Sequence, residues 1–394
     1  MQNQITVLSE WMARRGVAQD VLTTGMPGVD RQINKENLTI HSVRKLTTGL
    51  KSKYTGTVLL DESWALGVLL WCLKKKKNHH FDLIHVHTSG VAAPLYIALI
   101  AKSIMRIPLV LTIHCTRNLT YEPMHLLDDK IHSFVKKLEI KAVGTADQVI
   151  FLTEKTKTSF SKILPDSSNK YLEVQDVISQ HHLHFQRNPD KKKLFSSYGF
   201  DLQENDRIII FIGRIAHEKG WKMFVEICEA LSQSVDNVKY VIVGDGPQYD
   251  DMLKQLTEKR LFSRTLVTGF IAASKVPEFL HCADVLVIPS IHEELGGVSI
   301  EGVQAKVPIV ASDVGGLSVT FHHGETAMLS PFDDKDTFVR HILTLLRHPE
   351  QRKQLAETAR NRLESVYQPD LQLEKILHVY KQLSNKKENQ EWMI

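Results

Sequence analysis

Short apolar runs alternate with amphipathic stretches along most of the chain, which is the pattern of parallel α/β domains. In the first half, strand-like runs lie at residues 17–23, 81–86, 109–114 and 148–152. In the second half, they lie at residues 207–213, 238–243, 266–269, 285–289 and 308–312. Helices are expected between the later strands, at residues 221–232, 249–259, 275–281 and 298–305. The pattern predicts an α/β protein with two doubly wound domains.

Both ends of this pattern are helical. Ile5, Leu8 and Met12 recur at helical spacing, and Gly16 ends this first helix. An amphipathic helix is expected after Pro369, with apolar positions at Leu371, Leu373, Ile376, Leu377 and Tyr380.

Length and composition suit a globular protein of two domains. A chain of 394 residues is too long for one core, and a hydrophobic content of 43% is ample for two. The polar stretch at residues 188–193 is a candidate linker. Net charge is only +4 with both signs interspersed, so nucleic acid is not an expected partner. The four cysteines are widely spaced and lack a C-x-x-C pair, so neither a zinc site nor a disulfide framework is predicted.

No targeting or anchoring segment is expected. The longest apolar stretches, such as residues 64–73, are far below the roughly 18 residues that a membrane span needs, and no signal-peptide pattern opens the chain. A cytoplasmic protein is therefore expected. Residues 74–77 are all lysine, which fits either docking to an anionic membrane or a solvated helix end. The solvated end is favoured, and a membrane partner is not expected, because no aromatic face accompanies a periodic set of basic residues.

Two carboxylates follow a predicted buried strand at residues 285–288. Glu293 lies in the loop after this strand, and Glu301 lies one turn inside the next helix. Between them, Gly296 and Gly297 let a ligand approach the backbone, and the unpaired N–H groups at the helix start attract a pyrophosphate. A carboxylate nearby can hold a vicinal diol through paired hydrogen bonds. Two solvated acids near a helix start are the alternative for this pair alone.

Further motifs accompany the pair in a fixed order. They are Phe211-Ile212-Gly213-Arg214, Glu218-Lys219-Gly220, Val243-Gly244-Asp245-Gly246-Pro247, Gly269-Phe270, Pro289-Ser290-x-x-Glu293 and Pro308-Ile309-Val310-Ala311-Ser312-Asp313-Val314-Gly315-Gly316. This series resembles the retaining family 4 glycosyltransferases of GT-B fold, strongly over residues 205–330. The first half resembles the same family more weakly, through the runs at residues 81–87 and 108–114.

The resemblance implies two Rossmann-like domains that face each other across a cleft. It implies an acceptor-binding domain at residues 1–190, a nucleotide-sugar-binding domain at residues 191–365, and a helix at residues 366–394 that crosses back to the first domain. It also implies a UDP-sugar donor, a small hydroxylated acceptor, retention of the anomeric configuration, and no cofactor or metal. A phosphate oxygen is expected to help remove the acceptor proton, so no side-chain nucleophile is needed.

The resemblance assigns a role to each candidate site residue. Arg214 and Lys219 are expected to stabilise the charge that grows on the leaving diphosphate, although surface bonding to nearby acids is the alternative. Glu293 is expected to contact the donor sugar, and Glu301 the ribose. His114, at a strand end, matches a family histidine near the sugar or acceptor, but such a residue is often only a loop hydrogen-bonder. Further nucleotide-sugar contacts are assigned to Gly213, Gly244, Asp245, Phe270, Gly296, Gly297 and Val298.

The beginning of the chain departs from the family. Members begin with a strand and a glycine-rich turn, and this first strand is absent here. Either the native chain starts upstream of Met1 or the site is weakened, and the upstream start is favoured because losing a central strand exposes two apolar edges. His85 and His87 alternate on a predicted strand, where sheet packing is favoured over metal binding.

Two stretches of the sequence indicate the chemical class of the acceptor. Residues 112–129 and the run Glu293-Glu294-Leu295-Gly296 resemble the glycosyltransferases of aminoglycoside antibiotic assembly that act on 2-deoxystreptamine, notably the N-acetylglucosaminyltransferases of the butirosin and neomycin type. A small polycation also suits a rim of acids at Glu122, Asp128, Asp129 and Glu294. The resemblance therefore implies UDP-N-acetylglucosamine as donor and 2-deoxystreptamine, an aminocyclitol, as acceptor. A lipid or polysaccharide acceptor, and a catalytically weak sugar-nucleotide-binding protein, remain the alternatives.

Overall fold

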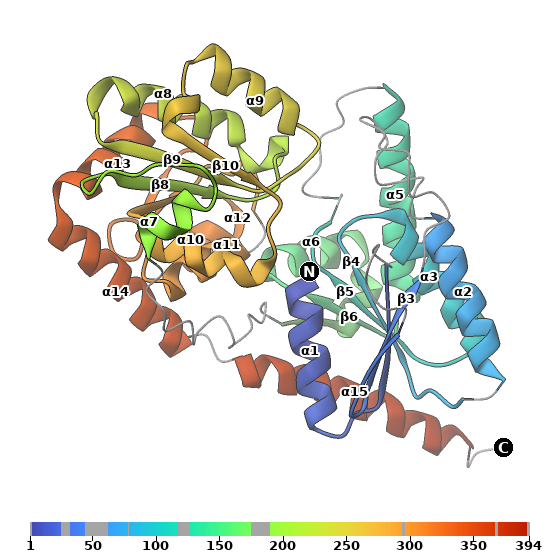
Figure 1. Cartoon of the computed structure of the whole chain (residues 1–394). Helices are drawn as coiled ribbons and strands as arrows, with labels where there is room; N and C mark the ends of the chain where they lie inside the picture. The colour runs from blue at the N-terminus through green and yellow to red at the C-terminus, as the bar shows by residue number, and fades with distance from the viewer. Residues whose placement is uncertain are drawn as a thin grey trace. The chain divides into compact units, whose positions relative to one another are not determined.

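The chain folds into two compact α/β units (Figure 1). The computed structural model describes residues 2–24, 32–43, 62–77, 79–116, 118, 126–174, 190–293, 296–366 and 369–391. Unit 1 consists of Met1–Val177 and Pro369–Ile394, and unit 2 consists of Ile178–Gln368. The α/β class predicted from the apolar pattern is confirmed.

Unit 2 contains a six-stranded sheet in which every pairing is parallel. Its spatial order is β10-β9-β8-β11-β12-β13. The strands are β8 (Arg207–Ile212), β9 (Val238–Val243), β10 (Thr265–Gly269), β11 (Val285–Ile288), β12 (Ile309–Ser312) and β13 (Met328–Ser330). The order reverses beside β8, so the carboxyl ends of β8 and β11 form the switch point where such sheets bind ligands.

Helices cover both faces of the unit 2 sheet (Figure 1). One face packs against α8 (Trp221–Ser234), α9 (Tyr249–Glu258) and α13 (Lys335–Arg347) through a core that includes Phe211, Phe224 and Tyr240. The other face packs mainly against α10 (Val276–Cys282), α11 (Gly297–Gln304), α12 (Gly315–Thr320) and α14 (Pro349–Val366), and α7 (Lys191–Ser196) joins it through Phe195. Because the strands are apolar on both sides, they are continuous apolar runs in the sequence.

Unit 1 contains two sheets. A parallel sheet has the order β4-β5-β6-β7, with β4 at Ile84–Thr88, β5 at Leu109–Ile113, β6 at Gln148–Phe151 and β7 at Tyr171–Glu173. A second sheet has the order β1-β3-β2, with β1 at Gln19–Thr24, β3 at Leu38–Val43 and β2 at Gln32–Lys35. Strands β1 and β4 are edge strands of these two sheets.

The helices of unit 1 pack on two faces of the β4–β7 sheet. On one face lie α2 (Glu62–Lys76), α3 (Ala92–Met105), α5 (Leu126–Thr145) and α6 (Glu154–Ile163). On the other face, α1 (Gln2–Arg14) and α15 (Pro369–Glu391) share a core with Val110, Ile150 and Val174. The Trp11 indole N–H donates to Asp370 Oδ1 at 2.6 Å and joins these two helices. The first and last described helices therefore complete the same core.

The predicted strands agree with the observed strands except at some boundaries. The run at residues 81–86 corresponds to β4, which lies at Ile84–Thr88 because its register is set by pairing with Leu109–Ile113 of β5. Strands β2, β3, β7 and β13 were not predicted, since they are short or largely polar. Among the described helices, none combines the length and apolar content needed to span a membrane.

The core between α1 and α15 can be tested with two leucines of one helix. Leu373 is 1% exposed in this core, whereas Leu371 is 52% exposed. We expect Leu373→Ala to destabilise unit 1 by about 2–5 kcal/mol because it leaves a cavity. Leu371→Ala is the matched control, with an expected change within about 0.5 kcal/mol. Denaturant unfolding followed by tryptophan fluorescence measures both, and equal losses would contradict this packing.

Candidate active site

Lys219 and Glu293 meet at the carboxyl ends of β8 and β11. Lys219 Nζ lies 2.7 Å from Glu293 Oε2, although 74 residues separate them in the chain. They meet because the turn η3 (His217–Lys219) and the loop after β11 are hydrogen-bonded to each other, with Ile291 N–H donating to the Glu218 carbonyl at 3.0 Å. Gly220 then packs so closely on Pro289 that a Cβ would lie 1.7 Å from the Pro289 carbonyl oxygen.

Glu293 is held on several sides. Its side chain is 8% exposed, and Ser290 Oγ donates to its Oε2 at 3.2 Å. Its carbonyl oxygen accepts from Gly316 N–H at 2.9 Å, and a Cβ on Gly315 would lie 2.0 Å from that oxygen. A buried carboxylate is stable only when it is paired, so Lys219 and Glu293 each depend on the other.

Glycines also join the ends of β8, β9 and β10. Gly244 has φ +143°, and a Cβ there would lie 1.9 Å from the Gly213 carbonyl oxygen. Gly213 N–H donates to Val243 and Gly244 N–H donates to Gly269, both at 3.0 Å. These contacts leave backbone, and no side chain, at the end of β8 beside Lys219.

The residues around the Lys219–Glu293 pair line a cavity of about 110 Å³. Five of the residues predicted for the site are among those that line it: Gly213, Lys219, Glu293, Gly297 and Val298. Ser290 and apolar side chains of β8 and β11 complete the lining. The lining thus combines a cation, a carboxylate and the first residues of α11 with apolar side chains.

Other predicted residues lie on nearby strand ends and loops of unit 2 but are not among those that line this cavity. Arg214 is the residue after Gly213, and its side chain is exposed. Asp245 is exposed, and its Oδ1 accepts from Gly246 N–H at 2.7 Å. Phe270 follows β10, and its ring is 79% exposed, which makes a face available for stacking on a base.

Helix α11 begins beside the cavity and carries the second carboxylate. Gly296 caps it with φ +64°, a conformation that glycine adopts without strain. Glu301 lies one turn beyond Gly297 and is partly buried. Burial raises the pKa of Glu301 to about 7. A carboxylate in this state gains from ligand hydroxyl groups that replace lost water.

His114 belongs to unit 1, where it follows β5. Its backbone N–H donates to the Thr88 carbonyl at 2.8 Å, and its Nε2 lies 2.9 Å from Nδ1 of His87. His85 bonds to Tyr380 and Thr112, in agreement with its predicted packing role in the sheet. The described residues contain no group of three or more His, Cys, Asp or Glu side chains that fits a metal ion.

The predicted acidic rim is only partly within the described chain. Glu122 and Glu294 lie outside the described residues. Of the candidate linker, residues 188 and 189 also lie outside them, whereas Asp190 caps α7 and residues 191–193 belong to that helix. Asp128 and Asp129 belong to α5, and the Asp129 side chain is exposed. The lysines at 74–76 form the last turn of α2, as expected for a solvated helix end.

Sequence reasoning missed several residues that shape these sites. Ser290 was quoted within a motif but given no role, although it bonds to Glu293. Gly220 and Gly315 were also quoted, and their role as contact points for other loops depends on the tertiary fold. Tyr380 was predicted only as an apolar position of its helix. Its bond to His85 spans 295 residues, and no local pattern indicates it.

Comparisons with known proteins agree with this architecture. The model for glycosyl transferases group 1 matches residues 192–362, and the model for glycosyltransferase family 4 matches residues 1–168. The 2-deoxystreptamine N-acetyl-D-glucosaminyltransferase of Niallia circulans is 42% identical over 84% of each chain. The 2-deoxystreptamine glucosyltransferase of Streptomyces kanamyceticus is 35% identical over 81% of this chain and 82% of its own. Anabaena HepE in complex with UDP-glucose has a TM-score of 0.66 at 18% identity, over 87% of this chain and 86% of its own.

Fold, site and comparisons together define a glycosyltransferase of the GT-B fold. The chain belongs to the family that these two models describe, with a family 4 region in its first half and a group 1 region in its second half. The resemblance to family 4 glycosyltransferases is thereby confirmed, as are the predicted GT-B fold and the predicted enzyme class.

The raised pKa of Glu301 predicts a pH-dependent stability. The folded-state pKa of about 7 lies above the ordinary 4.5, so ionising this carboxyl costs folding free energy as pH rises from 4.5 to 7. At 1.36 kcal/mol per pKa unit, the cost above pH 7 is roughly 3 kcal/mol. We expect Glu301→Gln to be more stable than wild type at pH 8 and equal to it below pH 4.5. Denaturant unfolding between pH 4 and 8 tests this.

The exposed Glu357 of α14 provides the control for this prediction. Glu357→Gln should leave the pH dependence of stability unchanged. If the stability of Glu301→Gln has the same pH dependence as that of the wild type, the raised pKa of this partly buried carboxyl is contradicted.

Proposed function

We propose that the protein transfers N-acetylglucosamine from UDP-N-acetylglucosamine to 2-deoxystreptamine, with retention of the anomeric configuration, in aminoglycoside assembly. The proposal assigns the donor to the cavity at the carboxyl ends of β8 and β11. The single observation that carries it is the Lys219–Glu293 pair in a cavity bounded by glycine backbone and the start of α11.

The chemistry of this cavity suits a sugar diphosphate. A leaving diphosphate gains negative charge while the sugar becomes oxocarbenium-like. Lys219 supplies a fixed positive charge, and the N–H groups at the start of α11 supply partial positive charge. Glu293, bound to the same lysine, supplies a carboxylate for sugar hydroxyls. Groups that are already positioned before the charge develops lower the barrier most.

The remaining predicted residues extend the same proposal. Arg214, exposed one residue after Gly213, adds a second cation for the diphosphate. Glu301 accepts hydrogen bonds from the ribose hydroxyls, and Phe270 offers its ring to the base. The complex of HepE with UDP-glucose supports a uridine nucleotide for this fold.

The relatives support the acceptor more strongly than the sugar. Two of them share 2-deoxystreptamine in their names, but one is an N-acetylglucosaminyltransferase and the other a glucosyltransferase. The higher identity, 42% against 35%, favours N-acetylglucosamine for this chain. The donor arm of the assay below must therefore include both sugars.

A donor and acceptor screen tests the function. We expect UDP release from UDP-N-acetylglucosamine only when 2-deoxystreptamine is present, and product NMR should show the donor's α configuration retained. UDP-glucose is the comparison donor, and inositol is an uncharged cyclitol control. UDP release with a lipid extract but none with 2-deoxystreptamine would show that the acceptor is a lipid. Binding of the UDP-sugar without any UDP release would favour a catalytically weak or inactive protein.

Substitutions at the cavity test the assigned residues. We expect Lys219→Ala, Glu293→Gln and Arg214→Ala each to lower kcat by about 100-fold or more, because each removes a group directed at developing charge. Lys222→Ala is the matched control, since Lys222 is an exposed lysine on the first turn of α8. Circular dichroism and thermal melting check folding. Near-wild-type turnover in any of the three variants would remove that residue from the site.

A further inference from the structure

Unit 1 contains a row of polar side chains on the sheet face that α1 and α15 cover. His85 and His87 alternate on β4, while Thr112 is the next-to-last residue of β5 and His114 follows this strand. The parallel register places His87 opposite Thr112, and the His114 N–H donates to the Thr88 carbonyl one step further along. Four side chains that are scattered in the sequence therefore lie together at one edge of the sheet.

His85 forms hydrogen bonds to a residue on α15 and to a residue on β5. Its Nδ1 lies 2.6 Å from Tyr380 Oη of α15, and its Nε2 lies 2.7 Å from Thr112 Oγ1. A neutral imidazole has one donor and one acceptor nitrogen, so both bonds form without charge. The His85 ring also stacks on His87, with centroids 4.1 Å apart. His85 and Tyr380 thus limit how the His87 ring can turn.

His87 bonds in turn to His114. The two rings are joined through His87 Nδ1 and His114 Nε2 at 2.9 Å. His114 is 7% exposed, and its other nitrogen, Nδ1, is buried without a partner among the described residues. Buried polar atoms are nearly always hydrogen-bonded, so each exception calls for a ligand or another explanation.

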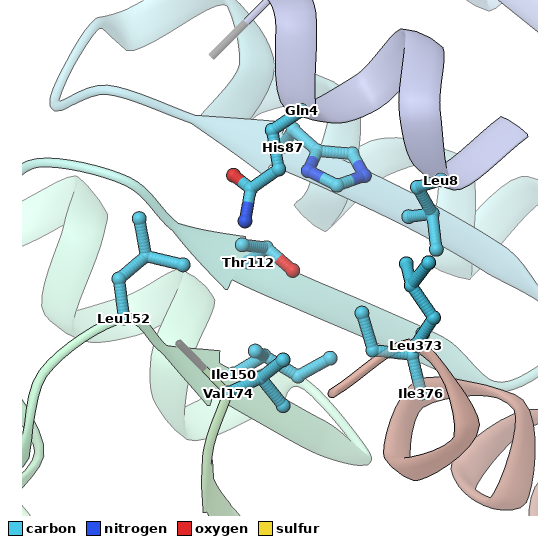
Figure 2. Close-up of a pocket in the computed structure, with 9 residues that line it drawn as sticks. All are labelled: Gln4, Leu8, His87, Thr112, Ile150, Leu152, Val174, Leu373 and Ile376. Carbon is cyan, nitrogen blue, oxygen red and sulfur yellow. The ribbon is translucent and has the colours of Figure 1, made fainter. Parts of the chain in front are cut away.

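A second buried polar atom without a described partner lies on the same side. Gln4 of α1 is 5% exposed, and its Oε1 has no partner in the described chain. Gln4, His87 and Thr112 line a small cavity of about 10 Å³, which is the scale of one water or hydroxyl group (Figure 2). Figure 2 shows the Gln4 amide directed toward Thr112. Apolar side chains form the rest of the cavity lining, so its polar atoms can hold about one hydroxyl group or water.

We propose that His87 is a positioning residue that holds His114 as a neutral imidazole and directs its Nδ1 to a hydroxyl group of one of the two substrates. The inference rests on the proposed function for the existence of such a substrate. It adds His87 as the residue that orients His114. It also adds His85 and Tyr380, whose contacts limit the rotation of the His87 ring.

The proton count explains what the pair can do. Two neutral imidazoles hold two protons on four nitrogens, and one of these protons lies in the shared bond. If His87 donates that proton, His114 carries its own proton on Nδ1 and donates to the hydroxyl. If His114 donates it, Nδ1 is bare and accepts from the hydroxyl. Either way the pair stays uncharged, which avoids repulsion of an ammonium-bearing acceptor.

Burial supports this charge state. It lowers the pKa of His87 to about 3 and, together with the neighbouring His87, lowers the pKa of His114. His85 shifts in the same direction, through burial and then the two other histidines. The positive charge of the chain's amino terminus lowers the pKa of His87 and His114 further, which also favours the neutral pair.

Two amide substitutions at His87 distinguish the loss of its hydrogen bond to His114 from a change in side-chain size. In His87→Asn the amide lies near the place of Nδ1 and can still bond to His114 Nε2, whereas in His87→Gln it lies near the place of Nε2 and cannot. We expect His87→Gln to lower kcat/KM by roughly 10- to 100-fold, the usual loss when an oriented imidazole loses its partner. His87→Asn should stay within about threefold of wild type. Equal rates in the two variants would overturn the proposal.

The kinetic constants also identify which substrate supplies the hydroxyl. A raised KM for the UDP-sugar in His87→Gln assigns the group to the donor, and a raised KM for the aminocyclitol assigns it to the acceptor. His378→Leu on the exposed side of α15 is the control, and it should leave both values unchanged.

A spectroscopic readout keeps the test independent of turnover. In protein labelled with ¹⁵N-histidine, we expect His114 to show one neutral tautomer in the wild type and in His87→Asn. His87→Gln should show averaged nitrogen shifts for His114, because its Nε2 has lost its partner. A single unchanged tautomer in all three proteins would overturn the inference even if the enzyme proved inactive with every donor tried.

Discussion

Three carbonyl oxygens at the carboxyl edge of the unit 2 sheet lie against α-carbons that cannot carry a side chain. They are those of Gly213, Pro289 and Glu293, approached by Gly244, Gly220 and Gly315. A Cβ at any of the three approaching positions would lie 2.0 Å or less from its oxygen, so the loops could not close. The ion pair, the cavity and the start of α11 all depend on this backbone contact, which is why the site tolerates no bulk where the diphosphate is proposed to bind.

Much of unit 2 could be predicted from the sequence because its signals are local. Runs such as residues 207–212 are apolar on both faces, and each is followed by an amphipathic helix. The site residues follow strands directly, so parallel topology brings Lys219 and Glu293 to one edge. Arg214 is the less predictable case, because an exposed side chain at a strand end is not oriented by its neighbours.

Unit 1 was harder to predict because its features depend on distant segments. Strand β2 is short and polar, and β3 lies between β1 and β2 in a sheet whose order the sequence does not indicate. His85 and His87 were predicted to pack in the sheet and His114 to belong to the site, but the bond between His87 and His114 joins a side chain of β4 to one that follows β5. Periodicity identifies which face a residue occupies, and it does not identify which side chains on that face bond to one another.

The packing of α15 against α1 has a consequence for how the protein is made. Trp11 and Asp370 are 359 residues apart, and the intervening chain contains all of unit 2. During synthesis, unit 2 can complete its own core before α15, which covers Leu8 and Met12, has been made. The part of this core that α15 covers stays open to water until residues 369–391 have left the ribosome, although Val110, Ile150 and Val174 can already pack against α1.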